Sequence, residues 1–171
     1  MFNTPGTKWL EERSVPFKRF HNVPDLIGRE TYIECTSRQL GIPTSLLLKT
    51  IVIENPAKKE QHPVVLVMRG DLAIDMPAFA KAVGFERARL CKADRAHGYT
   101  GYEFGGTSPF GLVRESDLKV YLDQSIIDAA NHGDVWINGG GIGNTVAINI
   151  DDLLGALKPT IVSVSKEMEK K

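Results

Sequence analysis

Apolar and polar residues follow one another along this chain in two periods, which predict a mixture of strands and helices. Short apolar runs bounded by turn-forming residues indicate strands, whereas apolar residues spaced three or four apart indicate helices. Strands are expected at 46–53, 64–69, 120–122, 135–138, 146–150 and 160–164, after an extended segment at 15–21. Helices are expected to start near Thr4 or Thr7 and to cover 29–40, 75–83, 126–131 and 152–158, with a short helical turn after Pro43.

Capping residues mark the ends of two of these helices. Gly41 and Gly84 stand directly after helical patterns, where a left-handed glycine commonly ends a helix, and Asp75 stands where a side chain accepts the first free amides.

The order of elements bounds the fold class. It contains too few strict strand–helix–strand repeats for a doubly wound sheet. It predicts a mixed α/β (α+β) fold in which helices surround a mixed sheet that is curved or barrel-like. We expect a single domain over 1–171, with its core at about 20–164 and a solvated, charged tail at 165–171.

Lys49 stands inside an otherwise apolar strand. Alternation across a sheet puts Leu47 and Ile51 on the face of Lys49, and Leu48 and Val52 on the other. Burying an ammonium without a partner costs several kcal/mol. The side chain must therefore reach the surface, pair with a carboxylate, or point into a cleft whose ligand is anionic.

The composition limits the partners and the compartment. The 171 residues include 21 Lys and Arg against 21 Asp and Glu, interspersed, so no broad positive field attracts DNA and a nucleic acid must be bound locally. The sequence shows no signal peptide and no apolar run of membrane-spanning length, so a cytoplasmic protein without membrane contact is expected. Cys35 and Cys91 lack metal-ligand spacing and are expected to be reduced core residues.

Two glycine-rich segments are candidates for binding an anion. In the first, at 105–111, Pro109 has no N–H and favours an extended Ser108, so amide donors must come from residues 105–108. Such a turn can direct several amides at one point, as in an oxyanion hole, although a glycine-rich hairpin has the same composition. The second, at 138–144, leads from strand to strand and lacks the Gly-Lys-Ser/Thr ending, so it is not a nucleotide-phosphate loop and is expected to form a facing wall.

Other catalytic arrangements are not evident. Ser108 lies in Gly-Thr-Ser-Pro rather than in a GxSxG elbow, so we interpret it as a hydrogen-bonding residue. The four histidines, at 21, 62, 97 and 132, are scattered, and only His97 is expected near the 105–111 turn. Because no carboxylate couple or ligand cluster stands out, the sequence gives no support for metal catalysis.

Taken together, these segments resemble the YbaK/ProX family. That family comprises freestanding aminoacyl-tRNA deacylases related to the editing domain inserted in bacterial prolyl-tRNA synthetases. The resemblance covers about 20–158. It rests on Leu-Leu-Lys49-Thr, Gly98-Tyr99, Gly105-Gly106-Thr107-Ser108-Pro109-Phe110-Gly111 and a strand ending in Val135-Trp136-Ile137-Asn138-Gly139-Gly140. It implies an α/β domain with a barrel-like sheet, and hydrolysis of the ester between a wrong amino acid and the 3′ end of tRNA, without metal or cofactor.

The resemblance also implies roles for particular residues. Lys49 matches the family's functional lysine and would hold the phosphate or ribose of the terminal adenosine. Gly105 and Gly106 match the turn that frames the ester and whose amides would polarise its carbonyl, so that water or a substrate hydroxyl can attack without a dedicated general base. His21 and Tyr32 fall where family members contact the amino acid. The other expected substrate-binding residues are Thr107, Ser108, Asn138, Gly139, Gly140 and Thr145.

Departures from the family pattern bear on specificity. Residues 141–145, Gly-Ile-Gly-Asn-Thr, replace the Lys-Arg-Gly-Leu-Asp expected of the cysteinyl-tRNA(Pro) branch, and 138–144 lack the histidine of the alanyl branch. The amino acid is therefore left unassigned. The missing basic residues suggest that an aminoacyl-tRNA synthetase, such as prolyl-tRNA synthetase, or an elongation factor helps to hold the tRNA. Phe104, Tyr102 and Phe110 are candidates either for stacking on the terminal adenosine or for the core.

These residues and the family resemblance are compatible with three functions. The first is a trans-editing hydrolase acting on mischarged tRNA. The second is a non-catalytic module that binds a tRNA end, a nucleotide or a protein in the same pocket. The third is a serine esterase that uses Ser108.

Overall fold

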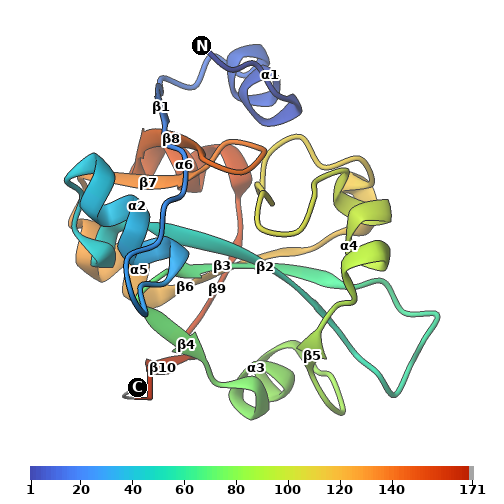
Figure 1. Ribbon diagram of the computed structural model, residues 1–171. Coiled ribbons are helices and arrows are strands. Elements are labelled where there is room, and N and C mark those ends of the chain that lie inside the picture. The colour runs from blue at the N-terminus through green and yellow to red at the C-terminus, as the bar shows by residue number, and fades with distance from the viewer. Residues whose placement is uncertain (170–171) are drawn as a thin grey trace.

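The computed structural model describes residues 1–169, in which six α-helices surround strands that lie in three sheets (Figure 1). The helices are α1 (Pro5–Glu12), α2 (Tyr32–Leu40), α3 (Met76–Val83), α4 (Ala93–Thr100), α5 (Gln124–Ala130) and α6 (Ile150–Leu157), with short 3₁₀ turns η1 (Thr44–Leu46) and η2 (Glu115–Asp117). The strands are β1 (Lys18–His21), β2 (Leu48–Glu54), β3 (Val64–Arg69), β4 (Leu72–Ile74), β5 (Arg89–Leu90), β6 (Val120–Asp123), β7 (Asp134–Asn138), β8 (Asn144–Asn149), β9 (Thr160–Val162) and β10 (Ser165–Glu167).

Side-chain caps set the helix boundaries. Thr4 begins α1 by accepting a hydrogen bond from the amide of Thr7, and Asp75 begins α3 as expected. In α2, Thr31 and Glu34 form a reciprocal capping box, so the helix begins at Tyr32 and not at residue 29. The expected left-handed ends are present at Gly41 (φ 69°) and Gly84 (φ 79°).

The sheets confirm the prediction of a mixed α/β fold. The largest has the order β5-β2-β3-β6-β9, with β2 antiparallel to its neighbours and β6 parallel to both of its own. A second, antiparallel sheet has the order β1-β8-β7 and meets the first where Leu47 bridges Trp136. The sequence left open whether the sheet is curved or barrel-like. The sheets formed by residues 1–169 are not closed into a barrel.

The two faces of β2 and β3 bury different cores. Leu48 and Val67 face a cluster that also contains residues of α1, α5, α6 and β8, whereas Leu66 and Met68 face a cluster under α3. Leu10 of α1 is fully buried in the first cluster, so the core begins before residue 20.

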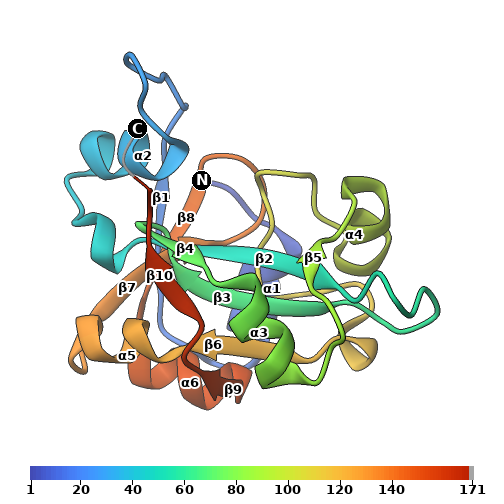
Figure 2. The same cartoon turned by 90° about the horizontal axis from the view of Figure 1, so that it is seen from below.

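The segment expected to be a solvated, charged tail is exposed at 166–169 but is paired with the sheet over part of its length. Residues 165–167 form β10, which pairs with β4 and crosses the lower face of the molecule (Figure 2). The amide of Val164 and the hydroxyl of Ser165 both donate to the buried carboxylate of Asp123, at 2.8 Å, which fixes the segment. The last two residues of the tail, 170–171, lie outside the described part of the chain.

Helix α4 has no counterpart among the expected elements, because its sequence is mostly polar. Its place is fixed by long-range charge pairs: the buried carboxylate of Glu54 on β2 accepts hydrogen bonds of 2.7 Å from Arg89 of β5 and from Arg95 of α4.

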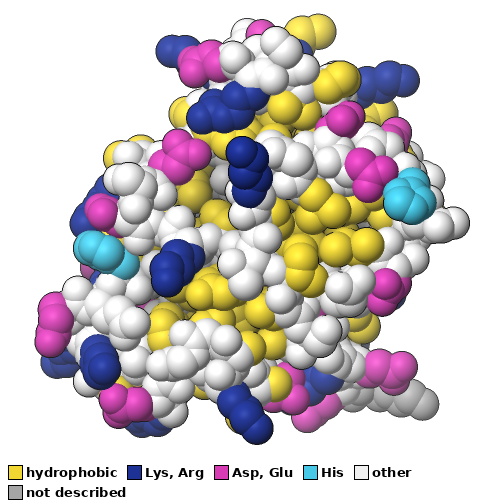
Figure 3. Space-filling model, turned by 180° about the vertical axis from the view of Figure 1, so that it is seen from behind, with side chains coloured by type: hydrophobic (Ala, Val, Ile, Leu, Met, Phe, Trp, Pro, Cys, Tyr) yellow, Lys and Arg dark blue, Asp and Glu magenta, His cyan; other side chains and the backbone are white. Residues whose placement is uncertain are grey.

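Figure 3 shows one face of the molecule, on which charges of both signs are interspersed around apolar side chains. No helix within residues 1–169 has the length and apolarity needed to cross a membrane.

Candidate functional site

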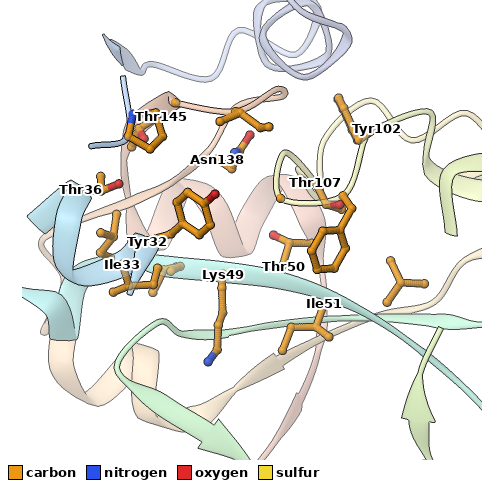
Figure 4. A pocket seen from close by; sticks show the side chains of 18 of the residues that line it. Tyr32, Ile33, Thr36, Lys49, Thr50, Ile51, Tyr102, Thr107, Asn138 and Thr145 are labelled. Atoms are coloured by element: carbon orange, nitrogen blue, oxygen red, sulfur yellow. The ribbon is translucent and has the colours of Figure 1, made fainter. Parts of the chain in front are cut away.

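A cavity of about 380 Å³ lies along β2 between α2 at one end and α4 at the other (Figure 4). Residues 47–52 form its floor, and its walls come from α2, from β5 and α4, from the loop at 104–107 and from the hairpin between β7 and β8. Six of the residues expected from the sequence line it: Tyr32, Lys49, Gly105, Thr107, Asn138 and Thr145.

Other expected residues do not line the cavity. His21 is exposed, with Nδ1 2.8 Å from Oδ1 of Asn144 beside the second glycine turn. Ser108 is fully buried, and its hydroxyl accepts a hydrogen bond of 3.2 Å from the amide of Phe110. The hydroxyl is therefore not placed as an accessible nucleophile, which removes the structural basis for a serine esterase.

The ammonium of Lys49 turns away from the cavity. It donates a hydrogen bond of 2.7 Å to the carbonyl of Leu72 on β4, whereas the hydroxyl of neighbouring Thr50 points into the cavity (Figure 4). Lys49 pairs with Met68, so its side chain shares the face of the cluster under α3. Burial lowers its pKa, and the nearby carboxylate of Asp71 only partly opposes that shift. None of the three arrangements expected from the sequence is therefore fully present, because the ammonium is bonded to a backbone carbonyl, not to a carboxylate, and points away from the cavity.

The first glycine turn leaves amides free beside the cavity. The amide of Gly106 donates to the carbonyl of Glu103 at 2.9 Å and so is committed within the turn. The amides of Gly105 and Thr107 have no acceptor within residues 1–169, and both residues line the cavity. Two donors beside a cleft can stabilise a developing negative charge on oxygen. Within residues 1–169, the amides of this turn that lack an acceptor are therefore those of Gly105 and Thr107, whereas the amide of Gly106 is engaged.

Gly106 allows close packing between the first glycine turn, at 105–111, and the second, at 138–144. A Cβ at this position would lie 2.8 Å from the backbone of Gly141, and the carbonyl of Gly106 accepts a hydrogen bond of 2.9 Å from the Gly141 amide. Gly105 has a positive φ of 85°, which favours glycine. The second turn therefore forms the facing wall that its sequence predicts.

Asn138, Gly139 and Gly140 build that wall. The side chain of Asn138 donates to the carbonyl of Gly141 at 3.0 Å and accepts from the amide of Gly140. The amide of Gly139 donates to the carbonyl of Asn144 at 2.8 Å. These polar groups hold the hairpin together, and Asn138 reaches the cavity while the two glycines do not.

Sequence reasoning missed two polar residues of the cavity. The side-chain oxygens Oγ1 of Thr50 and Oδ1 of Asn22 are buried without a hydrogen-bond partner within residues 1–169. Both residues line the cavity, and Asn22 uses its amide nitrogen for Gln39 at 2.7 Å. An unpartnered buried oxygen is costly unless a ligand or water pairs with it. The signal was present at Thr50, because alternation places its hydroxyl opposite Lys49.

Two ionisable groups that line the cavity, Cys91 and Tyr102, have raised pKa values, and the ammonium of Lys49 is turned away. Burial, followed by the charge of Glu54, raises the pKa of Cys91 to about 11, and burial raises the pKa of Tyr102 to about 12. Cys91 is thus a cavity residue and not the core residue expected. No aspartate, glutamate or histidine lines the cavity in the described part of the chain, and no three such groups there are arranged to hold a metal.

Three comparisons relate this chain to known proteins. A protein of Enterococcus faecalis named as a candidate Cys-tRNA(Pro)/Cys-tRNA(Cys) deacylase, EbsC, is 24% identical over 153 residues, which cover 88% of this chain and 86% of that protein. A proline–tRNA ligase of Geobacter sulfurreducens is 27% identical over 113 residues, 65% of this chain but 19% of the ligase. The crystal structure of a candidate trans-editing enzyme for prolyl-tRNA synthetase superposes with a TM-score of 0.78 at 16% identity, over 97% of this chain and 99% of that one.

The family assignment rests on more than half of the chain. The model of the aminoacyl-tRNA editing domain matches residues 30–156, a segment that contains β2, both glycine turns and the whole floor of the cavity. The resemblance seen in the sequence is confirmed: this chain belongs to the aminoacyl-tRNA editing domain family.

Proposed function

We propose that this protein is a trans-editing aminoacyl-tRNA deacylase that hydrolyses the ester of mischarged tRNA in the cavity along β2. Family membership supports the reaction class, and the pair of free amides at Gly105 and Thr107 supports its place. We further propose that the protein acts as a single domain in the cytoplasm, where prolyl-tRNA synthetase or an elongation factor delivers the substrate.

The free amides are the observation that carries this proposal. Attack on an aminoacyl ester moves negative charge onto the carbonyl oxygen, and donors already fixed in place stabilise that charge without reorganising. The turn is held by the Gly106 amide and by contact with Gly141, so Gly105 and Thr107 are fixed before substrate arrives.

The attacking group is water or a hydroxyl of the substrate itself. No carboxylate or imidazole among the lining residues can act as general base, as noted above. An aminoacyl ester is already activated, so positioning and oxyanion stabilisation supply the acceleration. This reaction uses neither a metal nor a cofactor.

The end of the cavity near α2 would receive the amino acid. It offers the hydroxyls of Tyr32, Thr36 and Thr145 and the oxygen of Asn22 that lacks a partner within residues 1–169, and the hydroxyl of Thr50 lies further along β2 (Figure 4). Such groups suit an α-amino group and a small side chain. A relative named as a Cys-tRNA deacylase makes cysteine the first substrate to try, together with alanine and serine.

Lys49 would position the terminal nucleotide only after a change of partner. Its ammonium would leave the carbonyl of Leu72 for a phosphate or ribose oxygen at the open edge of β2. A charge-assisted bond to phosphate is stronger than one to a neutral carbonyl, which favours the exchange once substrate is bound.

The test is deacylation of Cys-, Ala- and Ser-tRNA(Pro) by wild type and by Thr107→Pro, which removes one free amide. We expect wild type to release one amino acid over many turnovers, and Thr107→Pro to lower kcat by about 100-fold. Thr107→Ala, which keeps the amide, is the matched control and should retain most of kcat. A variant Thr107→Pro with the rate of wild type would refute the oxyanion role.

A second candidate is a non-catalytic module that binds the tRNA end in the same cavity. The engaged ammonium of Lys49 favours it, because that group is not poised toward substrate. It predicts saturable binding of charged tRNA and no loss of the ester. Multiple turnovers by wild type would exclude it.

A further inference from the structure

His21 lies outside the cavity but is joined to one of its walls. The pairing of β1 with β8 puts His21 opposite Asn144, the last residue of the second glycine turn. Nδ1 of His21 lies 2.8 Å from Oδ1 of Asn144, and the amide of Asn22 donates to the carbonyl of Gly143 at 3.0 Å. Neither His21 nor Asn144 lines the cavity. Their contact therefore acts on the wall from outside the cavity.

Asn144 holds the second glycine turn at three points. Its Nδ2 donates to the carbonyl of Gly140 at 2.8 Å. Its backbone carbonyl accepts from the amide of Gly139 at 2.8 Å, and its backbone amide donates to the carbonyl of Gly141 at 3.3 Å. A Cβ at Gly141 would lie 2.9 Å from Nδ2 of Asn144, so this side chain packs directly against the turn. Asn144 thus fixes three consecutive glycines of the wall.

The bonding of Asn144 determines where His21 carries its proton. Because Nδ2 of Asn144 donates to Gly140, it is the oxygen Oδ1 that faces the imidazole. An acceptor needs a donor, so the neutral form of His21 must be protonated on Nδ1. The side chain of His21 has no other hydrogen bond and no ion pair within residues 1–169, so holding Asn144 is its one polar contact there.

The second turn transmits this constraint to the first. The amide of Gly141 donates to the carbonyl of Gly106 at 2.9 Å, and the amide of Gly106 donates to the carbonyl of Glu103 at 2.9 Å. Gly105 and Thr107, whose amides lack an acceptor within residues 1–169, are the neighbours of Gly106 in the chain. A shift of Gly141 would therefore move Gly106 and these two amides with it.

We propose that His21 is a positioning residue for ester hydrolysis. Its Nδ1–H holds Asn144, and Asn144 keeps the second glycine turn bonded to Gly106. The amides of Gly105 and Thr107 thereby stay in place, and donors fixed before the reaction stabilise a developing charge without reorganising. This role rests on the proposed function, because it matters only if those amides bind the oxyanion. It differs from the role implied by the resemblance, in which His21 contacts the amino acid.

The kinetic test compares His21→Leu with His21→Asn in the deacylation assay. Leucine keeps the branch at Cγ but offers no donor, whereas asparagine places an amide N–H at the δ position, where Nδ1 stands in histidine. We expect His21→Leu to lower kcat about 5-fold, the value of one hydrogen bond, and His21→Asn to recover most of the loss. KM should change little, because His21 does not line the cavity.

His132→Asn is the matched control. His132 is also exposed, and its Nδ1 also lies beside a side-chain oxygen, Oδ2 of Asp151 at 3.1 Å. It belongs to neither the cavity nor a glycine turn, so kcat should equal that of wild type.

Two measurements without substrate separate this role from the deacylase. Nitrogen NMR of isotopically labelled protein should show the neutral imidazole of His21 protonated on Nδ1. Hydrogen exchange of the Gly141 amide should be faster in His21→Leu than in wild type, because its bond to Gly106 is loosened, and His21→Asn should restore the slow exchange.

The outcomes are distinct. Protonation on Nε2, or equal exchange at Gly141 in His21→Leu and wild type, would overturn the positioning role even if wild type hydrolyses the ester. An unchanged kcat in His21→Leu would also overturn it, and a raised KM in that variant would indicate direct contact with substrate instead. If wild type hydrolyses no ester, the deacylase is refuted, whereas the Nδ1 proton and the faster exchange in His21→Leu would still support the hold of His21 on the two turns.

Discussion

The Nζ atom of Lys49 lies 2.7 Å from the carbonyl oxygen of Leu72 and so occupies the face of β2 opposite the cavity. This placement makes a stability prediction that is separate from catalysis. Burial lowers the pKa of Lys49 below its ordinary 10.5, so the folded state binds fewer protons than the unfolded chain between the two pKa values. The stability of wild type therefore rises with pH in that window.

Lys49→Met keeps an unbranched side chain and removes the charge. We expect the variant to unfold at higher urea concentration than wild type at pH 7, with the difference shrinking as the pH approaches 10.5. Lys58→Met, in the exposed loop after β2, is the control and should follow wild type at both pH values. A Lys49→Met protein that is less stable at pH 7 would show that the ammonium is a net stabilising group.

Thr50→Val separates stability from function. The hydroxyl of Thr50 is buried without a partner among residues 1–169, so replacing it with a methyl group of similar shape should raise the melting temperature or leave it unchanged. If the hydroxyl contacts substrate, kcat/KM for the edited tRNA should fall about 10-fold. Thr50→Ser retains the hydroxyl and should keep the activity; equal activity of Thr50→Val and wild type would remove Thr50 from the site.

Gly106→Ala tests the contact between the two glycine turns. The added Cβ would lie 2.8 Å from backbone atoms of Gly141, so the turns must separate and the free amides move. We expect kcat for ester hydrolysis to fall at least about 10-fold, because a displacement of 1 Å at such a site is costly. Gly98→Ala, whose Cβ would meet open space, should leave kcat unchanged. If Gly106→Ala and Gly98→Ala have the same kcat, the contact between the two glycine turns is not needed for hydrolysis.

Gly6→Ala tests whether α1 holds the glycine turns. A Cβ at Gly6 would lie 2.5 Å from the carbonyl oxygen of Gly139 and 3.2 Å from Oγ of Ser108. The helix must then shift, at an expected cost of about 1–3 kcal/mol in the free energy of unfolding. Gly155→Ala in α6 meets nothing within 4 Å and should gain about 0.5–1 kcal/mol. Urea denaturation measures the free energy of unfolding of both variants. Equal stability of Gly6→Ala and wild type would contradict the prediction.

Asp123 makes folding sensitive to acid. Burial opposes ionisation of its carboxyl, but hydrogen bonds from Ser125, Val164 and Ser165 outweigh burial and lower the pKa below 3.8. The stabilisation is therefore present above the ordinary pKa and is lost as the pH falls through the lowered one.

Asp123→Asn replaces one accepting oxygen with a donor, which would face either the Val164 amide at the Oδ1 position or the Ser165 hydroxyl at the Oδ2 position. We expect a loss of about 1–3 kcal/mol at pH 7, which shrinks as the pH falls below 3.8 and through the lowered pKa of Asp123. Urea midpoints across this range measure it. A loss that does not shrink as the pH falls below 3.8 would assign the effect to packing instead of charge.

Local patterns in the sequence were sufficient for most elements of the fold. The caps at Thr4, Asp75, Gly41 and Gly84 act within a few residues, so they could be recognised without the tertiary structure. Helix α4 could not, because its anchor is the pairing of Arg95 with Glu54, 41 residues away.

The sequence by itself determined the family, the faces of β2 and the two turns that border the cavity. These follow from alternation along a strand and from motifs whose residues are close in the chain. Only the tertiary structure decided that the carbonyl of Leu72 accepts from the Lys49 ammonium and that Phe104 is exposed while Tyr102 is buried. It also decided that the Gly106 amide is engaged, whereas those of Gly105 and Thr107 have no acceptor within residues 1–169. The physical reason is that a hydrogen bond or a buried contact has two partners, and the second one is selected by packing between distant segments.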